Sequence, residues 1–199
     1  MKRYTLIGLT GQTGAGKSTV SQWFAEWGAM VLNADEMVSL LYVPGSPCLT
    51  AVAAVFGADI LDSSGGLKRE ELAKRAFASP DKTALLGSLV HPFVSALMFE
   101  RLRGAEGVVI FDAPQLFEAN ADVICDYVIS VVADKDIRFQ RIIARDNLSA
   151  EQAQSRMNAQ LDEAFFREHS DFVIENNGDA AAIKPLAADI YKQITSGVT

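Results

Sequence analysis

Short apolar runs alternate with longer amphipathic stretches along this 199-residue chain. The apolar runs cover residues 4–10, 30–32, 108–111, 127–132 and 172–174. Runs of this length, separated by stretches with helical periodicity, are typical of buried parallel strands joined by crossover helices. The pattern therefore predicts an α/β fold, with a five-stranded parallel sheet and helices on both of its faces.

The first strand leads into a predicted helix over residues 17–27, and the last strand is followed by a turn at residues 176–178. A closing helix is predicted over residues 180–195. Pro185 falls in its first turns, where a missing backbone N–H is tolerated.

A long helical stretch interrupts this alternation between residues 36 and 104. It is broken at residues 44–47 and 63–66, where proline, glycine and serine cluster. The stretch contains too much helix for a simple crossover connection. We therefore predict that residues 36–104 form a substrate-binding insertion.

A second interruption, residues 136–168, is predicted to form two helical pieces around residues 147–149. Ser149 and Gln152 have the spacing of a capping box for the second piece. The stretch is rich in arginine, with Arg138, Arg141, Arg145, Arg156 and Arg167. An arginine-bearing helical hairpin of this kind is predicted to be a lid, which leaves residues 1–35, 105–135 and 169–199 as the core.

The net charge, the number of histidines and the spacing of the cysteines argue against some classes of function. The formal net charge is −7, which argues against a general nucleic-acid binder because such proteins carry a basic face. The two histidines are too few for a histidine-based metal site. Cys48 and Cys125 are far apart in sequence and are interpreted as reduced thiols of a cytoplasmic protein.

The ends and the apolar runs of the chain predict no export or membrane insertion. A strand is predicted almost at the N-terminus, which leaves no room for a signal-peptide pattern. No uninterrupted apolar run approaches the 18 or so residues of a membrane span. Both features predict a cytoplasmic protein that does not associate with a membrane.

The strongest chemical signal is the pattern G-x-x-x-x-G-K-[ST] between the first strand and the first helix. Its backbone N–H groups and the helix N-terminus are suited to phosphate oxygens. Lys17 is predicted to reach the β- and γ-phosphates, and the Ser18 hydroxyl to bind Mg²⁺. A chance glycine-rich turn is the alternative, but the flanking strand and helix favour a P-loop NTPase core with three layers. The predicted nucleotide-binding residues of this segment are Gly11, Gln12, Thr13, Gly14, Ala15, Gly16, Lys17, Ser18 and Thr19.

Two aspartates follow predicted strands, at the edge where such sheets bind ligands. Asp35 is suited to orient or deprotonate an attacking hydroxyl, or else to cap the helix that begins near Glu36. Asp112 closes an apolar strand, where P-loop proteins place the carboxylate that holds Mg²⁺. The alternative for Asp112 is a polar residue that only ends the strand.

Four further residues are candidates for ligand contacts. Arg141 and Arg145 have guanidinium groups suited to phosphate oxygens, with a solvated helix face as the alternative. His91, followed by a proline, is predicted either to be a pocket residue before a helix or to be a buried or capping histidine. Arg69 is predicted to meet an anionic substrate or to be a surface charge.

Together these residues resemble the dephospho-coenzyme A kinase family over nearly the whole chain. The phosphate loop alone indicates only a P-loop protein, whereas the later motifs in this order are far more specific. The matching residues are Gly8–Gly11, Ala34-Asp35, Pro44-Gly45, Phe56-Gly57, Leu67, Arg69, Leu72, Phe77, His91-Pro92, Pro114, Leu116-Phe117-Glu118, Arg141, Arg145, Gln160, Asp171–Ile174 and Asn176-Asn177-Gly178.

The resemblance implies a reaction, a fold and a set of ligands. The family transfers the γ-phosphoryl of ATP to the ribose 3′-hydroxyl of dephospho-CoA, the last step of CoA synthesis, and it requires Mg²⁺. Its fold is like that of nucleoside monophosphate kinases, with a five-stranded parallel core, a helical CoA-binding domain and a lid. It implies that Asp35 is the base and that dephospho-CoA and ATP are the partners of a monomer or small homo-oligomer.

Residue roles are also implied. Lys17, Asp35 and Arg145 are the implied catalytic residues, and Ser18 and Asp112 the implied metal ligands. Arg141 and Asn177 join the nucleotide-binding residues. The implied substrate-binding residues are Asp35, Arg69, His91, Pro114, Leu116 and Glu118.

Some positions depart from the family pattern. Asn33 stands where the family usually has aspartate, and Ser39 where it usually has arginine. Gln115 and Phe166 also differ, with Arg167 one position from an expected basic residue. The alternatives are therefore another metabolite or nucleotide kinase on the same scaffold, or a weakly active CoA-binding relative. The guanine-recognition and D-x-x-G motifs of a GTPase switch are missing.

Overall fold

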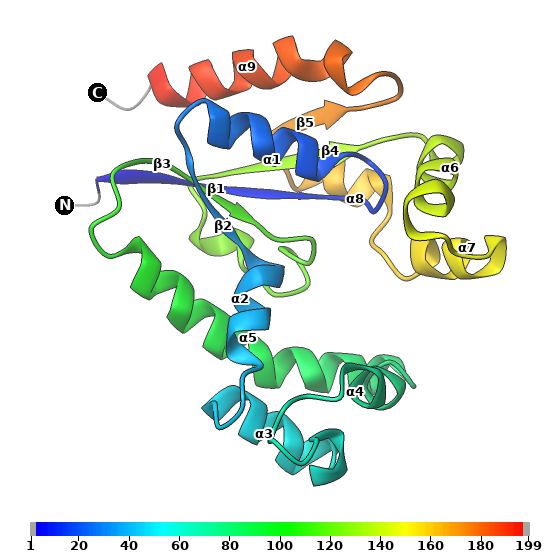
Figure 1. Cartoon of the computed structure of the whole chain (residues 1–199). Helices are drawn as coiled ribbons and strands as arrows, with labels where there is room; N and C mark the ends of the chain where they lie inside the picture. The colour runs from blue at the N-terminus through cyan, green and yellow to red at the C-terminus, as the bar shows by residue number, and fades with distance from the viewer. Residues whose placement is uncertain (1–2, 197–199) are drawn as a thin grey trace. The chain divides into compact units, whose positions relative to one another are not determined.

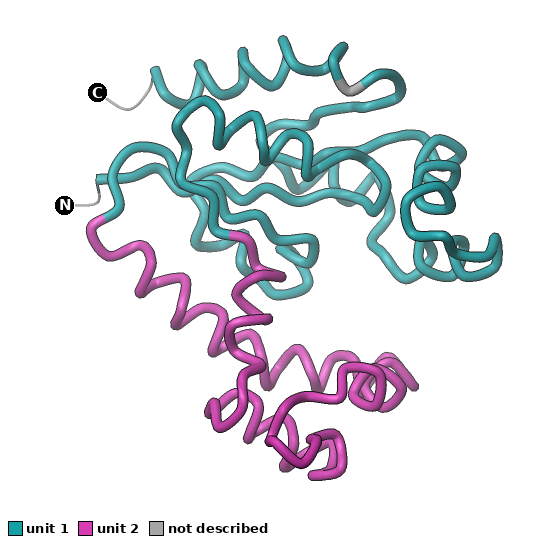
Figure 2. The backbone as a smooth tube through the Cα atoms, in the orientation of Figure 1, with its two compact units in different colours: residues 1–32, 105–199 teal, residues 33–104 magenta. Residues whose placement is uncertain are grey.

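The computed structural model describes residues 3–196, apart from the side chain of Ala180. The chain forms two compact units (Figure 2). The first contains Met1–Leu32 and Ala105–Thr199, and the second contains Asn33–Gly104. Each unit is described separately below.

A five-stranded parallel sheet forms the centre of the first unit (Figure 1), and the sequence prediction of this sheet is confirmed. The strand order is β2-β3-β1-β4-β5, so β1 is central and carries the phosphate loop at its carboxyl end. The strands are β1 Tyr4–Gly11, β2 Met30–Asn33, β3 Gly107–Asp112, β4 Tyr127–Val132 and β5 Phe172–Glu175.

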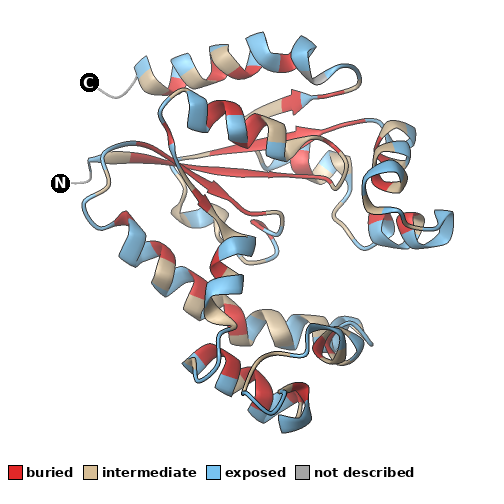
Figure 3. Cartoon of the chain, in the orientation of Figure 1, coloured by how far each residue is buried: buried red, intermediate tan, exposed pale blue. Residues whose placement is uncertain are grey.

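One face of the sheet is covered by helices α1 (Lys17–Glu26) and α9 (Ala180–Ser196) (Figure 1). Alternate strand residues such as Ile7, Ile110 and Ile129 point to this face and are fully buried, as period-two alternation requires. Buried residues concentrate along the strands (Figure 3). Burial of these apolar side chains is the main source of stability for this layer.

The opposite face is covered by the segment after β3 and by helix α8 (Glu163–Glu168), which packs on β4 and β5. Gly8 allows a close approach here, since a Cβ at this position would lie 2.6 Å from a methyl group of Leu116. Phe117 makes edge contacts with Phe165 and Phe166. These contacts complete the third layer of the predicted fold.

Residues 135–168 form three helices, so the prediction of two helical pieces is wrong in number. α6 (Lys135–Asp146) and α7 (Ala150–Asn158) are separated at residues 147–149 as expected, and the Ser149–Gln152 capping box is present. The third piece is α8. The sequence signal for α8 is weak because it has only six residues and is stabilised by tertiary packing of Phe166.

The second unit is helical, with predicted breaks near residues 44–47 and 63–66 present as turns. Its helices are α2 Ala34–Leu41, α3 Pro47–Phe56, α4 Arg69–Ala76 and α5 Pro80–Leu102. Asn33, Ser46 and Ser79 cap α2, α3 and α5 with their side-chain oxygens. Helices α2, α3 and α4 all pack against α5.

Helix α5 is long and apolar enough, by length and composition, to cross a membrane, and no other helix within residues 3–196 is. The expectation that no uninterrupted apolar run approaches the length of a span still holds, because polar residues such as Ser88, His91 and Ser95 interrupt α5. One such helix is weak evidence for a membrane segment. In this structure α5 instead packs against the other three helices of its unit.

Candidate functional site

The phosphate loop joins β1 to α1, and no side chain caps the first N–H groups of the helix. Gly16 is the N-cap of α1 with φ 101°, and it provides no side-chain acceptor for the first N–H groups. No acidic residue lies in the first turn. Unsatisfied N–H groups and the helix dipole therefore make this end of α1 suited to an anion such as a phosphate.

Gly11 is required by the close approach of β4. A Cβ at Gly11 would lie 2.2 Å from the backbone oxygen of Val131, far inside any allowed contact. The backbone N–H of Gln12 donates to that same oxygen at 3.1 Å. The beginning of the phosphate loop is therefore held against β4 by a contact that no other residue type permits.

Asn176, which directly follows β5, forms a hydrogen bond to the phosphate loop. It is 2% exposed, and its Nδ2 donates to the carbonyl oxygen of Ala15 at 2.7 Å. Arg141 from α6 forms further hydrogen bonds to the loop and to the segment after β5. Its Nη1 donates to Gly14 O at 3.4 Å and to Asn176 O at 3.0 Å, and its Nη2 donates to Gly178 O at 2.7 Å.

Replacing Asn176 with alanine is expected to lower the free energy of unfolding by about 1–3 kcal/mol, because it leaves the buried Ala15 carbonyl without its donor. Urea unfolding measures this change. Asn158→Ala is the control, since Asn158 is exposed at the end of α7. Equal stability of the two variants would show that Asn176 does not brace the loop.

Lys17 and Asp112 form a buried ion pair. The Nζ of Lys17 contacts Oδ1 of Asp112, with side-chain exposures of 16% and 4%. The sequence predicted both residues at the phosphates and the metal, and the structure brings them together. The carboxylate neutralises the lysine charge, which avoids the cost of an unpaired buried charge.

Ser18 and Asp112 offer oxygen ligands of the kind that Mg²⁺ prefers. Ser18 is exposed at the start of α1, and its side chain has no hydrogen-bond partner among the described residues. Within residues 3–196, no group of three or more His, Cys, Asp or Glu side chains is placed to hold a metal ion. Mg²⁺ does not require such a group, because it commonly binds one or two carboxylates together with substrate phosphates and water. The donor set therefore fits Mg²⁺.

Arg145 lies at the end of α6, in the hairpin predicted to be a lid. Its Nε and Nη2 donate to Asp146 at 2.7 and 2.8 Å, and Arg156 from α7 donates to the same carboxylate at 2.7 Å. The hydrogen bonds from Arg145 hold the pKa of Asp146 below its usual range. Two arginines thus share one partly buried carboxylate, which leaves a net positive charge at this point of the hairpin.

The other predicted ligand residues of this unit differ in their exposure and in their hydrogen-bond partners. Asn177 lies above β5, where its Oδ1 accepts from Asp134 N at 2.7 Å, so Asn176 rather than Asn177 touches the loop. Pro114 O accepts from the Thr10 hydroxyl, and Glu118 is exposed. The Leu116 side chain is 0% exposed, and the prediction that it contacts substrate is wrong for this structure because it fills the space beside Gly8.

Asp35 belongs to the second unit, in the first turn of α2. The prediction that it caps this helix is wrong, because Asn33 is the N-cap and its Oδ1 accepts from Glu36 N at 3.1 Å. The Asp35 side chain is exposed and has no hydrogen-bond or ion-pair partner among the described residues. The carboxylate is therefore available to a ligand, as expected for a base. Ser39 bonds only to the backbone oxygen of Asp35, at 3.1 Å.

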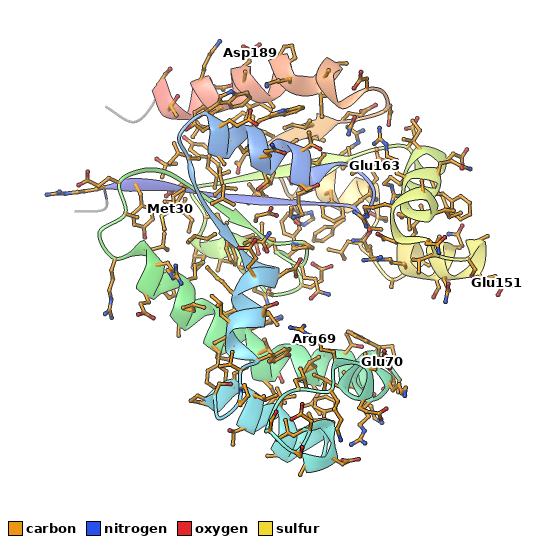
Figure 4. The ribbon with its side chains drawn as sticks, viewed as in Figure 1. Met30, Arg69, Glu70, Glu151, Glu163 and Asp189 are labelled. Carbon is orange, nitrogen blue, oxygen red and sulfur yellow. The ribbon has the colours of Figure 1, made fainter. Side chains whose placement is uncertain are left out.

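Arg69 and His91 also belong to the second unit. Arg69 is exposed at the start of α4 (Figure 4). Burial raises the pKa of Tyr42 to about 12, and the charge of Arg69 opposes that rise, so the two side chains are electrostatically coupled. The prediction that His91 precedes a helix is wrong, because it lies inside α5, half-buried over Gly87, and burial lowers its pKa.

Three residues of the loop surroundings were not assigned as site residues from the sequence. These are Asn176, Gln160 and Arg138. Gln160 accepts a hydrogen bond from Thr13 N, and Arg138 is 7% exposed with its Nε donating to Ala133 O at 2.9 Å. Asn176 and Gln160 stand in the family motifs, which was their only sequence signal.

Comparison with known proteins gives one consistent family. The family model for dephospho-CoA kinase matches residues 5–182. A dephospho-CoA kinase of Syntrophotalea carbinolica is 36% identical, covering 97% of this chain and 93% of the relative. One of Corynebacterium diphtheriae is 38% identical, covering 97% and 98%.

Solved structures agree on the fold. A crystal structure from Thermus thermophilus is 29% identical with a TM-score of 0.83, covering 98% of this chain and 100% of that one. A dephospho-CoA kinase from Campylobacter jejuni has a TM-score of 0.62 at 20% identity, covering 98% and 99%. A shikimate kinase from Acinetobacter baumannii has a TM-score of 0.57 at 19% identity, covering 98% and 96%. The last two support the P-loop kinase fold only.

Proposed function

The chain belongs to the dephospho-CoA kinase family and phosphorylates dephospho-CoA with ATP in the last step of CoA biosynthesis, and we propose that Lys17, Asp35 and Arg145 are its catalytic residues. The observation that carries this assignment is the open N-terminus of α1, with Lys17 beside Asp112. The acceptor group is the ribose 3′-hydroxyl of dephospho-CoA.

Catalysis of phosphoryl transfer consists mainly of positioning and charge neutralisation. The N–H groups of the phosphate loop that have no acceptor in the protein, together with those at the start of α1, hold the β- and γ-phosphates, and Lys17 leaves Asp112 to contact the γ-phosphate. Asp35 accepts the proton of the attacking hydroxyl. Arg145 and Arg141 neutralise phosphate charge when the α6–α7 hairpin closes as a lid, which also excludes water.

Mg²⁺ is proposed as the cofactor, held by Ser18 and Asp112. When bound, it neutralises charge on the transferring phosphoryl group. Departure of Lys17 frees the Asp112 carboxylate for this role. We therefore propose that this carboxylate pairs with Lys17 as in this structure and would bind Mg²⁺ when the nucleotide is present.

Substrate contacts are proposed for Arg69, His91, Pro114 and Glu118. Arg69 is exposed and positive, which suits the phosphates of a CoA-like ligand. Asn177 is proposed to contact the nucleotide. We further propose that residues 36–104 form the substrate-binding insertion; the compact unit that contains them begins at Asn33. We also propose that residues 136–168 form the lid; within this range, α8 packs on the sheet.

The net charge and the family membership are the basis for proposals about oligomeric state, location and macromolecular partners. We propose a cytoplasmic monomer or small homo-oligomer that binds no nucleic acid and no membrane. The net charge of −7 supports the absence of nucleic-acid binding, because phosphate backbones attract basic surfaces.

The test is a coupled ADP-release assay with Mg·ATP, in which dephospho-CoA is compared with adenosine, AMP and shikimate. Dephospho-CoA alone is expected to stimulate ADP release strongly. Stimulation by another acceptor instead would assign the chain to a different metabolite kinase. ATP binding without stimulation by any of them would indicate a weakly active relative in which Asn33 and Ser39 have altered the substrate side.

A further inference from the structure

Gln160 makes a long-range contact with the phosphate loop. Its side-chain Oε1 accepts a hydrogen bond from the backbone N–H of Thr13 at 2.8 Å. The two residues are 147 positions apart in sequence. Thr13 lies inside the loop, so a side chain from a distant segment fixes one of the loop's peptide groups.

Gln160 lies in the short connection between α7 and α8. The connection follows Asn158, the last residue of α7, and precedes Glu163, the first residue of α8, which Figure 4 labels. Helices α6 and α7 pack against each other, and α8 packs on β4 and β5. The connection therefore joins a helical hairpin to a helix that is anchored on the sheet.

The next residue of the loop, Gly14, is contacted from helix α6 of the hairpin. Arg141 of α6 donates to Gly14 O at 3.4 Å. Arg141 within α6 and Gln160 just after α7 thus contact neighbouring loop residues, Arg141 as a donor and Gln160 as an acceptor. A movement of α6 or of the connection after α7 relative to the loop is therefore expected to alter these contacts.

We propose that Gln160 is a positioning residue that orients the phosphate loop through Thr13 and links nucleotide binding to the α6–α7 hairpin. This inference rests on the proposed function, because it assigns the loop to ATP. A neutral carboxamide suits the position, since it accepts from the amide without placing a negative charge next to the phosphates.

The test compares Gln160→Ala with Gln154→Ala as the matched control. Gln154 lies on α7 and donates to Asn158 at 2.8 Å, with no loop contact. Loss of one hydrogen bond is expected to raise the KM for ATP about 3- to 10-fold in Gln160→Ala. The KM for dephospho-CoA and the melting temperature are expected to stay near wild type, as in Gln154→Ala.

A second readout needs no activity. Hydrogen exchange of the Thr13 amide, followed by NMR, is expected to accelerate roughly ten-fold in Gln160→Ala because its acceptor is lost. Gln160→Glu keeps an acceptor oxygen, so the Thr13 amide stays protected. Its added charge is expected to weaken binding of a non-hydrolysable ATP analogue more than the alanine change does.

Unchanged Thr13 exchange and unchanged ATP KM in Gln160→Ala would overturn the proposal. A fall in melting temperature with both KM values unchanged would also overturn it, since that outcome indicates a purely structural side chain. Failure of wild-type enzyme to use dephospho-CoA would contradict the proposed function instead. The Thr13 exchange would still report on Gln160 in that case, so the two failures are distinguishable.

Discussion

Lys17→Ala is expected to lower kcat by roughly 10³-fold, the range seen when a preorganised charge at a developing anion is removed. Lys17 is paired with Asp112, and its side chain is only 16% exposed. Mg·ATP has to separate this pair, so the lysine exchanges one anionic partner for another. Without Lys17, the γ-phosphate loses the only lysine of the loop. The coupled ADP-release assay measures the effect.

The alanine change also leaves Asp112 buried without its cation, which costs several kcal/mol when one partner of a buried pair is removed. Lys17→Arg keeps the positive charge and separates folding from catalysis. It is expected to remain folded in a urea titration while kcat still falls, because a planar guanidinium does not replace a point charge in this loop. Lys192→Ala, at a 76% exposed side chain, is the control. An unchanged rate in Lys17→Ala would exclude the loop from the mechanism.

Asp35→Asn is expected to reduce kcat by roughly 10²-fold or more if Asp35 is the base, with ATP binding little altered. The amide keeps the size of the side chain but accepts no proton. Since Asn33 caps α2, the substitution removes no capping interaction. The stability of the second unit is therefore expected to stay within about 0.5 kcal/mol, as for surface changes that remove no such contact.

Glu36→Gln is the matched control for Asp35, because it neutralises a neighbouring exposed carboxylate in the same helical turn. Its kcat is expected to equal that of wild type. A loss of ATP affinity in Asp35→Asn without a loss of kcat would assign Asp35 to metal binding or structure. Equal kcat losses in both variants would point to the local negative charge rather than to a base.

The elements that the sequence predicted correctly are those with strong local signals. The five apolar strands, the phosphate loop and the Ser149–Gln152 capping box follow from periodicity and short-range spacing. Errors arose where local signals were weak or ambiguous. Helix α8 has too few residues to show a period. One of the two predictions for His91 placed a helix start after it, although α5 continues through His91 and the following proline.

Phe166 illustrates a departure that only packing explains. The family pattern favours a basic residue nearby, whereas Phe166 is 1% exposed and contacts Phe117 on the third layer. An apolar side chain is the expected choice at such a buried position. This departure therefore lies in the core and not at an exposed position of the proposed lid.

The sequence by itself determined the fold class, the family and the chemical groups at the phosphate loop, because these depend on residue type and spacing along the chain. The tertiary structure decided which distant groups meet. It paired Lys17 with Asp112, placed Asn176 rather than Asn177 under the loop, and brought Gln160 to Thr13. Such contacts depend on strand order and helix packing. In a strand, a shift of one residue turns a side chain to the other face of the sheet. No local sequence pattern encodes which distant side chains meet.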